Sequence, residues 1–400
     1  MTATQRREVR LKELMRPISH YTDAVLCGDF LYMSGAAAFD KDGNLVGAGD
    51  VVRQCEQTCE NIDRMLSAVD MSPRDVVYFK VFMQEVYDGP KINPVRQAFH
   101  GASKPGSTRV GVGHFVHPGM LIEVECVAYK PFSGGPARRE IRCENLFQPP
   151  SHYIDVVECG DFAFISGTGP IGPNGKSMHF GDVARQAHLT MENMQVMLDA
   201  VGMGFEDVAK VVCYLENIHD RPHINAARRR FFGKSRPAST LFGVRRLAIP
   251  GMNHEIEAIA YKPRDPGKPR RKEIKAEGIH APISHYTDAV KCGDFLFVSG
   301  QAPFNKDLKL VGAGDIIKQA VRTHENLKRI MKAGGMGFGD IAKVTVYMEN
   351  CEEHPAVNKV RRKYFGHSRP ASTLFGANAL ALPGMKLEID AICYKPVSTM

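Results

Sequence analysis

The sequence contains no hydrophobic run long enough to cross a membrane. A transmembrane helix needs about 18 or more consecutive apolar residues, and no apolar stretch approaches that length. The N-terminal segment MTATQRREVRLKELMRP is charged and lacks the apolar central region of a secretory signal peptide. We therefore expect a cytoplasmic protein that does not bind a membrane.

Cysteine pairs with metal-binding spacing are also missing. None of the ten cysteines stands in C-x-x-C spacing, so nothing indicates a zinc ribbon or a thioredoxin-type redox site. Cys55 and Cys59 lie four residues apart on a predicted helix, but no histidine or cysteine stands at ligand spacing beside them. Buried free thiols are the expected state, and we expect neither a metal nor another cofactor.

The charge balance favours neither sign strongly. The 400 residues are 44% hydrophobic and 24% charged, with a formal net charge of +8, which is typical of a soluble globular protein. A slightly basic chain can bind nucleic acid or an anionic ligand. However, no RNP-type aromatic pattern accompanies the basic runs at 228–230 and 361–363. We interpret these runs as solvated helix faces, and nucleic acid is the less expected partner.

The most informative feature is a threefold internal repeat. ISHYTDAVLCGDFLYMSG at 18–35 matches PSHYIDVVECGDFAFISG at 150–167 and ISHYTDAVKCGDFLFVSG at 283–300. SRPASTLFG occurs at 235–243 and 368–376, with a looser copy, SKPGSTRVG, at 103–111. The repeat predicts three units at 17–131, 150–263 and 282–396. Residues 1–16 precede them, and the connectors 132–149 and 264–281, rich in glycine, proline and charge, are expected to be exposed linkers.

Each unit is predicted to alternate strands with helices. Short β-rich runs at 24–27 and 30–34 flank Gly28-Asp29, which is a hairpin turn signal. Gly-Asp pairs at 49–50, 181–182 and 314–315 precede helical patterns, and the aspartate can cap the first turn. The order ββ(β)αβαββ gives an α+β unit with its helices on one face of the sheet. Three bare sheet faces can then bury one another around a pseudo-threefold axis.

The repeated residues resemble the reactive-intermediate deaminase family (Rid, also called YjgF). The signature is Pro-Ala-x-Ser/Thr, followed by Pro-Gly and a strand reading Glu-Ile-Glu-Ala-Ile-Ala. Family members are homotrimers of single-unit chains with a chorismate-mutase-like fold, and they bind ligands between subunits. The resemblance therefore implies a pseudo-trimer in which three units of one chain take the place of three subunits, with a central barrel of sheets and helices outside. We expect a monomer, or a dimer of such pseudo-trimers.

The resemblance also implies a site in each cleft between units. It assigns a water-holding glutamate, a tyrosine near the ligand, a Ser-Gly pair that ends the second strand, and a helix asparagine. The glutamates are Glu123, Glu255 and Glu388; the tyrosines are Tyr21, Tyr153 and Tyr286; the Ser-Gly pairs are Ser34-Gly35, Ser166-Gly167 and Ser299-Gly300; and the asparagines are Asn93, Asn225 and Asn358.

One part of the family pattern is absent. Deaminating members read Pro-Ala-Arg, where the arginine clamps the substrate carboxylate, but all three copies have serine at that position: Ser107, Ser239 and Ser372. A buried carboxylate without a charged partner is costly. The substrate is therefore expected to be neutral or to be anchored in another way.

The first copy differs again two residues later. Arg109 stands where the other copies have Leu241 and Leu374, and on a strand it shares a face with Ser107. One hypothesis is that only this cleft keeps an anion anchor. The alternative, equally weighted, is that Arg109 pairs with Glu123 or Glu125 on the adjacent strand.

The last strand of each unit carries two acidic residues on one face, for example Glu255 and Glu257. Neighbouring carboxylates raise each other's pKa, which suits a base that works near neutral pH. We interpret the first acidic residue as functional and the second as structural. The histidines of the Ser-His-Tyr segments are interpreted as hydrogen-bonded structural groups rather than proton shuttles; they are His20, His152 and His285.

Three functions remain open at this stage. The first is Rid-type hydrolysis of an imine, enamine or related C–N bond. The second is ring opening of a cyclic amide, as in cyanuric acid hydrolase and barbiturase, which use Ser-Lys pairs; Lys210 and Lys343 are candidates, but the first copy has Tyr78 there. The third is a non-catalytic ligand- or RNA-binding role. A nucleophilic serine is the less expected chemistry, because no base is visible beside Ser239 or Ser372.

Overall fold

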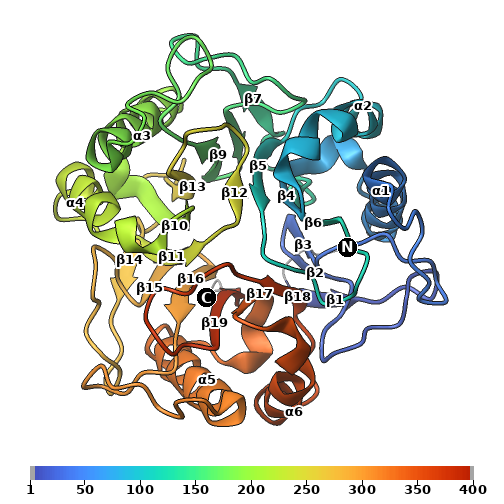
Figure 1. Cartoon of the computed structure of the whole chain (residues 1–400), viewed down its shortest axis with the longest axis vertical. Helices are drawn as coiled ribbons and strands as arrows, with labels where there is room; N and C mark the ends of the chain where they lie inside the picture. Colours follow the sequence, from blue (N-terminus) through green and yellow to red (C-terminus); the bar gives the residue numbers. More distant parts are fainter. Residues whose placement is uncertain (1–4, 397–400) are drawn as a thin grey trace.

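Three similar units surround a central axis, with their sheets inside and their helices outside (Figure 1). The structure is a computed structural model that describes residues 5–396. The α+β architecture and the inner barrel of sheets predicted from the repeat are confirmed. No helix in this described part of the chain is long and apolar enough to cross a membrane.

The elements of the three units correspond, except that one short strand of unit 2 has no counterpart in the other units. Unit 1 has strands β1 (Arg6–Val9), β2 (Ala24–Cys27), β3 (Phe30–Met33), β4 (Val76–Met83), β5 (Gly106–Gly111) and β6 (Ile122–Tyr129), with helices α1 (Val51–Ser67) and α2 (Gly89–His100). Unit 2 has β7 (Arg139–Ile141), β8 (Val156–Cys159), β9 (Phe162–Thr168), β10 (Val208–Leu215), β11 (Ala238–Gly243), β12 (Arg246–Leu247) and β13 (His254–Tyr261), with α3 (Val183–Asp199) and α4 (Arg221–Phe232). Unit 3 has β14 (Lys272–Ile274), β15 (Ala289–Cys292), β16 (Phe295–Gln301), β17 (Ile341–Met348), β18 (Ala371–Gly376) and β19 (Leu387–Tyr394), with α5 (Ile316–Ala333) and α6 (His354–Phe365). The strand without a counterpart is β12, which pairs with β5 of unit 1.

The connectors are not free linkers over their whole length. β7 and β14 lie within them and pair antiparallel with β8 and β15, just as β1 pairs with β2. Each connector therefore adds an edge strand to the unit that follows it. The expectation of plain exposed linkers is wrong for these residues, because a short strand can satisfy its backbone groups on the open edge of a neighbouring sheet.

The predicted helix starts are confirmed. The carboxylate of Asp50 accepts hydrogen bonds from the backbone amides of Val52 and Arg53, and Asp182 and Asp315 cap α3 and α5 in the same way. In each unit the first helix packs against the sheet through buried apolar side chains. The ten cysteines are free and buried, as expected.

The inner faces of the sheets meet at the axis. Phe30, Phe162 and Phe295 occupy equivalent positions, and their ring centroids lie 5.5–5.6 Å apart. A second aromatic group, which includes Phe82, Phe242 and Phe375, lies in a separate buried cluster. Edge-to-face aromatic contacts of this kind stabilise a core beyond the area they bury. No unit could bury its inner face alone, so the repeat solves the burial problem inside one chain.

Candidate active site between the units

A cavity of about 470 Å³ lies between units 1 and 3. Tyr21, Gly35 and Glu123 of unit 1 line it together with Arg361 and Ser372 of unit 3. We call this cleft A. The equivalent residues define cleft B between units 2 and 1, and cleft C between units 3 and 2. The equivalent residues at the boundary that we call cleft B are Tyr153, Gly167, Glu255, Ser107 and Arg96, and those at cleft C are Tyr286, Gly300, Glu388, Ser239 and Arg228.

The Ser-Gly pairs hold the seam of each cleft together. The backbone amide of Ser372 donates to Oγ of Ser34 at 2.8 Å, and the amide of Gly35 donates to the carbonyl of Ser372 at 3.0 Å. The other seams repeat the first bond, with Ser107 donating to Ser166 at 2.9 Å and Ser239 donating to Ser299 at 2.8 Å. The hydroxyls of Ser34, Ser166 and Ser299 thus bind the backbone of the neighbouring unit. We therefore assign these three serines a positioning role.

The first acidic residue of each closing strand lies buried in its cleft. Burial, reinforced by the charge of Glu125 and opposed by Lys343, raises the pKa of Glu123 to about 8. Burial likewise raises the pKa of Glu255 and Glu388 to about 8, with a further contribution from Glu257 and Asp390 respectively. Each group therefore exchanges a proton close to neutral pH, which is what a general base for water requires. The role of these carboxylates as water-holding groups stays a prediction.

A glycine makes room for each of these glutamates. A Cβ atom built on Gly35 would lie 1.8 Å from Oε1 of Glu123, and the same atom on Gly167 or Gly300 would lie 2.0 or 1.8 Å from Glu255 or Glu388. No side chain other than hydrogen fits there while the carboxylate keeps its position. The second-strand Ser-Gly pair thus sets where the glutamate points.

Replacing Gly35 by alanine is therefore expected to push the Glu123 carboxylate out of place in cleft A. The backbone of Gly35 is not in the left-handed region, so the chain should fold with a melting temperature close to that of the parent. Ligand binding in cleft A should be lost, as measured by calorimetry with one site fewer per chain. Unchanged stoichiometry would contradict this arrangement.

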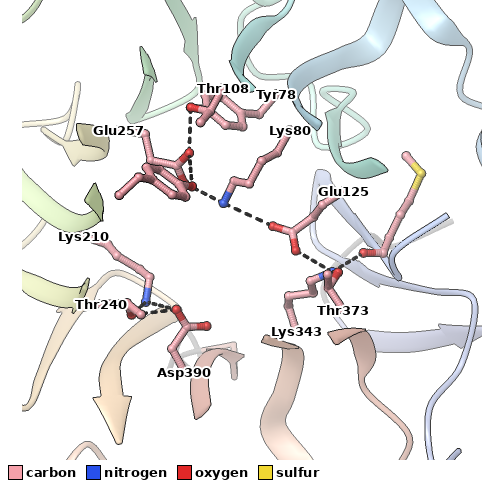
Figure 2. A network of polar contacts seen from close by, with 12 residues as sticks. Tyr78, Lys80, Thr108, Glu125, Lys210, Thr240, Glu257, Lys343, Thr373 and Asp390 are labelled. Atoms are coloured by element: carbon pink, nitrogen blue, oxygen red, sulfur yellow. Dashed lines mark hydrogen bonds and ion pairs between the residues drawn. The ribbon is translucent and has the colours of Figure 1, made fainter. Parts of the chain in front are cut away.

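The second acidic residues belong to a buried network on the axis (Figure 2). Lys80 contacts Glu257 at 2.6 Å and Glu125 at 3.5 Å, while Lys343 contacts Glu125 at 3.0 Å. Lys210 contacts Asp390 at 2.8 Å. Although burial opposes it, the two lysines lower the pKa of Glu125 to about 2. These ion pairs agree with the interpretation of the second acidic residue of each strand as structural.

The network also bears on the cyclic-amide hypothesis. Lys210 lies 3.3 Å from Oγ1 of Thr240, and Lys343 donates to Oγ1 of Thr373 at 2.6 Å. The serines Ser239 and Ser372 precede these threonines, so they lie on the other face of their strands. The lysines are thus paired with threonine and carboxylate rather than with serine. Within residues 5–396, Lys210 and Lys343 make no hydrogen bond with Ser239 or Ser372, so the Ser-Lys pair of the cyclic-amide hypothesis does not form.

Sequence reasoning missed a buried arginine in every cleft. Arg96, Arg228 and Arg361 are each 1% exposed, so interpreting the basic runs as solvated is wrong for Arg228 and Arg361. In cleft A, Arg361 donates to Oγ of Ser372 at 3.1 Å, and in cleft B, Arg96 donates to Oγ of Ser107 at 3.0 Å. The available signal was that each arginine follows the helix asparagine by three residues in all copies, which places both on one helix face.

These arginines have no carboxylate partner among the described residues. Nε of each has no hydrogen-bond acceptor, and burial lowers the pKa of Arg96 and Arg361 to about 10. A buried guanidinium is normally paired with an anion. Arg361 lines the cavity of cleft A together with Ser372. Ser372 is the position at which deaminating family members have their strand arginine.

Arg109 points into cleft B. The charges that raise its pKa, against the larger opposing effect of burial, are those of Tyr153 and Glu255. The alternative that Arg109 pairs with Glu123 or Glu125 is wrong. The reason is topological: β4 lies between β5 and β6, and Glu125 is bound by Lys80 and Lys343 instead.

The remaining candidates lie at the rims of the clefts. Oδ1 of Asn93 accepts from Oγ of Ser151 in the next unit at 2.6 Å, and Asn358 accepts from Ser19 in the same manner. The imidazole Nε2 atoms of His20, His152 and His285 contact backbone carbonyls of the neighbouring unit at 2.8–3.0 Å. These histidines join units, in keeping with a structural role.

The chain belongs to the family whose model is described as Endoribonuclease L-PSP. That model matches three times in tandem, at residues 12–130, 143–262 and 278–395. The resemblance to the Rid family is thereby confirmed in all three units.

Characterised relatives align with one unit at a time. The RutC family protein PH0854 of Pyrococcus horikoshii is 36% identical over 125 residues, which is 31% of this chain and 98% of that protein. The mouse 2-iminobutanoate/2-iminopropanoate deaminase is 30% identical over 122 residues, 30% of this chain and 90% of that protein. A solved chorismatase structure covers 80% of this chain and 93% of its own at 15% identity and a TM-score of 0.52, which shows a shared fold alone.

Proposed function

We propose that this protein hydrolyses the C=N bond of small imines or enamines that carry a carboxylate, in the clefts between its units. The observation that carries the proposal is Arg361, a fully buried guanidinium without an anionic partner that lines the same cavity as Glu123. A relative of known name, the mouse deaminase, acts on 2-iminobutanoate and 2-iminopropanoate. Both compounds combine an imine with a carboxylate.

The arginine on the helix can replace the carboxylate-binding arginine that is absent from the strand. The family clamp is missing from the strand, but in clefts A and B the serine at that position accepts a hydrogen bond from an arginine on α6 or α2. A guanidinium binds a carboxylate through two parallel hydrogen bonds. In this chain the positive charge would thus come from the helix instead of the strand, and the carboxylate would bind at the same position.

Glu123 would hold and activate water. In its ionised form the carboxylate takes a proton from water as the hydroxyl adds to the imine carbon, and it passes that proton to the imine nitrogen, which gives a neutral carbinolamine. The carboxylate then takes the proton of the carbinolamine hydroxyl and passes it to the nitrogen, so that the carbonyl forms as ammonia leaves. The sum is imine plus water giving ketone plus ammonia, with no cofactor involved.

The proposed anchor is tested by removing all three helix arginines. The variant Arg96→Met/Arg228→Met/Arg361→Met should lose about 10–100-fold in kcat/KM for the imine of a 2-oxo acid, because a charge-assisted hydrogen bond contributes about 1.5–3 kcal/mol. Ammonia release from an imine generated in situ is the measurement. A neutral imine of the same size is the control and should be hydrolysed at the parent rate.

Two outcomes would contradict the proposal. An equal loss for the neutral and the anionic imine would make these arginines structural, and a parent protein that releases no ammonia from either compound would exclude imine hydrolysis. Ammonia release from a cyclic amide would then favour ring opening, and salt-sensitive retention of RNA would favour a binding role.

We also propose that the chain acts without a partner chain in its sites. Both walls of each cleft come from one polypeptide, as with Glu123 and Arg361 in cleft A. Homotrimerisation, which single-unit relatives would need to complete a cleft, is unnecessary here.

A further inference from the structure

Cleft B differs from the other two clefts by an exchange of two residues. Cleft B has Gly89 at the start of α2 and Arg109 on β5, whereas cleft A has His354 at the start of α6 and Leu374 on β18. Cleft C has Arg221 and Leu241 in these positions. Each cleft therefore has one basic residue here, but only cleft B has it on the strand, beside its serine.

The two changes in cleft B depend on each other. A Cβ atom on Gly89 would lie 2.0 Å from Nη1 and 2.1 Å from Cζ of Arg109. Any residue larger than glycine would therefore displace the guanidinium. This close approach indicates that Arg109 is held in a defined place rather than left free at the surface.

Arg109 and Arg96 together place two positive charges in cleft B. They are close enough that the charge of Arg109 adds to burial in lowering the pKa of Arg96. The Arg96 guanidinium donates to the hydroxyls of Ser107 and Ser151 and lies 5.3 Å from the centroid of the Phe79 ring, and Nε of Arg109 is buried without an acceptor among the described residues. Among residues 5–396, neither arginine forms an ion pair.

The acidic residue of cleft B is Glu255, whose charge acts on Arg109 but which forms no ion pair with either arginine among residues 5–396. Burial raises the pKa of Glu255 to about 8, so most of this carboxyl group is uncharged at lower pH. Buried charges are stable only when they are paired. Arg96 is buried and Arg109 is half-buried, and an external ligand with two negative charges would pair both guanidiniums.

We propose that cleft B binds a small dicarboxylate, with one carboxylate at Arg96 and the other at Arg109, while clefts A and C accept a monocarboxylate. As a substrate assignment this rests on the proposed function, and it adds that the imine taken by cleft B derives from a dicarboxylic 2-oxo acid. The binding site itself does not depend on catalysis.

Calorimetric titration of the full chain with succinate and with butyrate tests the site without turnover. Arg109→Leu gives cleft B the strand residue of the other two clefts. This variant should bind succinate at cleft B at least tenfold more weakly than the parent and should bind butyrate equally well. Equal succinate affinity in parent and variant would overturn the proposal. So would tighter binding of inorganic phosphate than of succinate, since a compact dianion would then be the ligand.

A transplant tests the same idea as a gain. His354→Gly/Leu374→Arg places the exchanged pair in cleft A and should create a second succinate site per chain. This readout stands even if Arg109→Leu folds poorly. A transplant that folds but gains no succinate site would overturn the proposal. Succinate selectivity in a parent without imine hydrolysis would contradict the proposed function and leave this binding site in place.

Discussion

Replacing Glu123, Glu255 and Glu388 together by glutamine is expected to lower imine hydrolysis by about 10²–10⁴-fold, the usual contribution of a general base. Glutamine keeps the shape of the side chain but cannot take a proton from water. The triple variant is needed because any single cleft that keeps its glutamate would sustain turnover. The three single variants then divide the activity among the clefts. Parent-level hydrolysis by the triple variant would remove the glutamates from the mechanism.

The pH dependence provides a second readout of the same variant. Because the carboxylate must be ionised to act as the base, kcat/KM of the parent should rise with pH and level off above an apparent pKa near 8. The triple glutamine variant should lack this limb in its residual activity. A rate that falls through the same pH range would instead assign the glutamates to the role of an acid.

Stability should change in the opposite sense from activity. The pKa of about 8 in the folded protein lies above the value of about 4.3 in an unfolded chain, so protonation favours folding. The resulting stability is complete below about pH 4 and is lost as the pH rises through about 8. The melting temperature of the parent should therefore fall as the pH is raised from about 4 to above 8. The melting temperature of the glutamine variant should fall less over the same range. Lower stability of the variant at pH 9 would contradict this.

Lys80→Thr is expected to destabilise the protein by about 3–5 kcal/mol, the usual cost of removing one partner from a buried ion pair. Lys80 is 8% exposed and contacts Glu257 at 2.6 Å. Without it, Glu257 keeps only the hydroxyls of Tyr78 and Tyr214. Threonine is chosen because unit 3 has Thr345 at the equivalent position. The free energy of unfolding in urea is the measurement.

The double variant Tyr78→Lys/Lys80→Thr should recover most of this loss. It gives unit 1 the arrangement of unit 3, where Lys343 reaches Glu125 of the next unit at 3.0 Å. A lysine at position 78 would reach Glu257 likewise, since the Tyr78 hydroxyl already lies 3.2 Å from that carboxylate. A single variant within 1 kcal/mol of the parent, or a double variant no more stable than the single, would show that the axial charges are not coupled.

Much of the fold was predictable from local patterns. The hairpin at Gly28-Asp29 and the helices capped by Asp50 and Asp182 were predicted correctly from the sequence, because turns and caps depend on neighbouring residues. The strands inside the connectors were missed. β7 is exposed and has little apolar pattern of its own, and it forms because the edge of β8 is available.

The candidate site was predictable only in part. The repeat and the family resemblance indicated Glu123, Gly35 and Tyr21, and these residues line one cavity in the structure. Arg361 was overlooked because it stands in a run of three basic residues, of which it alone is buried. Arg109 was noticed as an exception, and of the two alternatives given for it, the pair with Glu123 or Glu125 is wrong, because strand order cannot be predicted from strand spacing.

The sequence by itself determined that three copies of one unit exist, that each has a helix-covered sheet, and that each carries two acidic residues on one face of its last strand. These properties follow from residue periodicity and from the repeat, which are local. Only the tertiary structure decided which charges meet. The approach of one unit to the next places Arg361 beside Ser372 and across from Glu123, leaves Arg109 without a carboxylate, and directs the lysines to the axis. Pairings across units, such as Lys343 with Glu125, join residues up to more than 200 positions apart, and they are fixed by the burial of three sheet faces against one another.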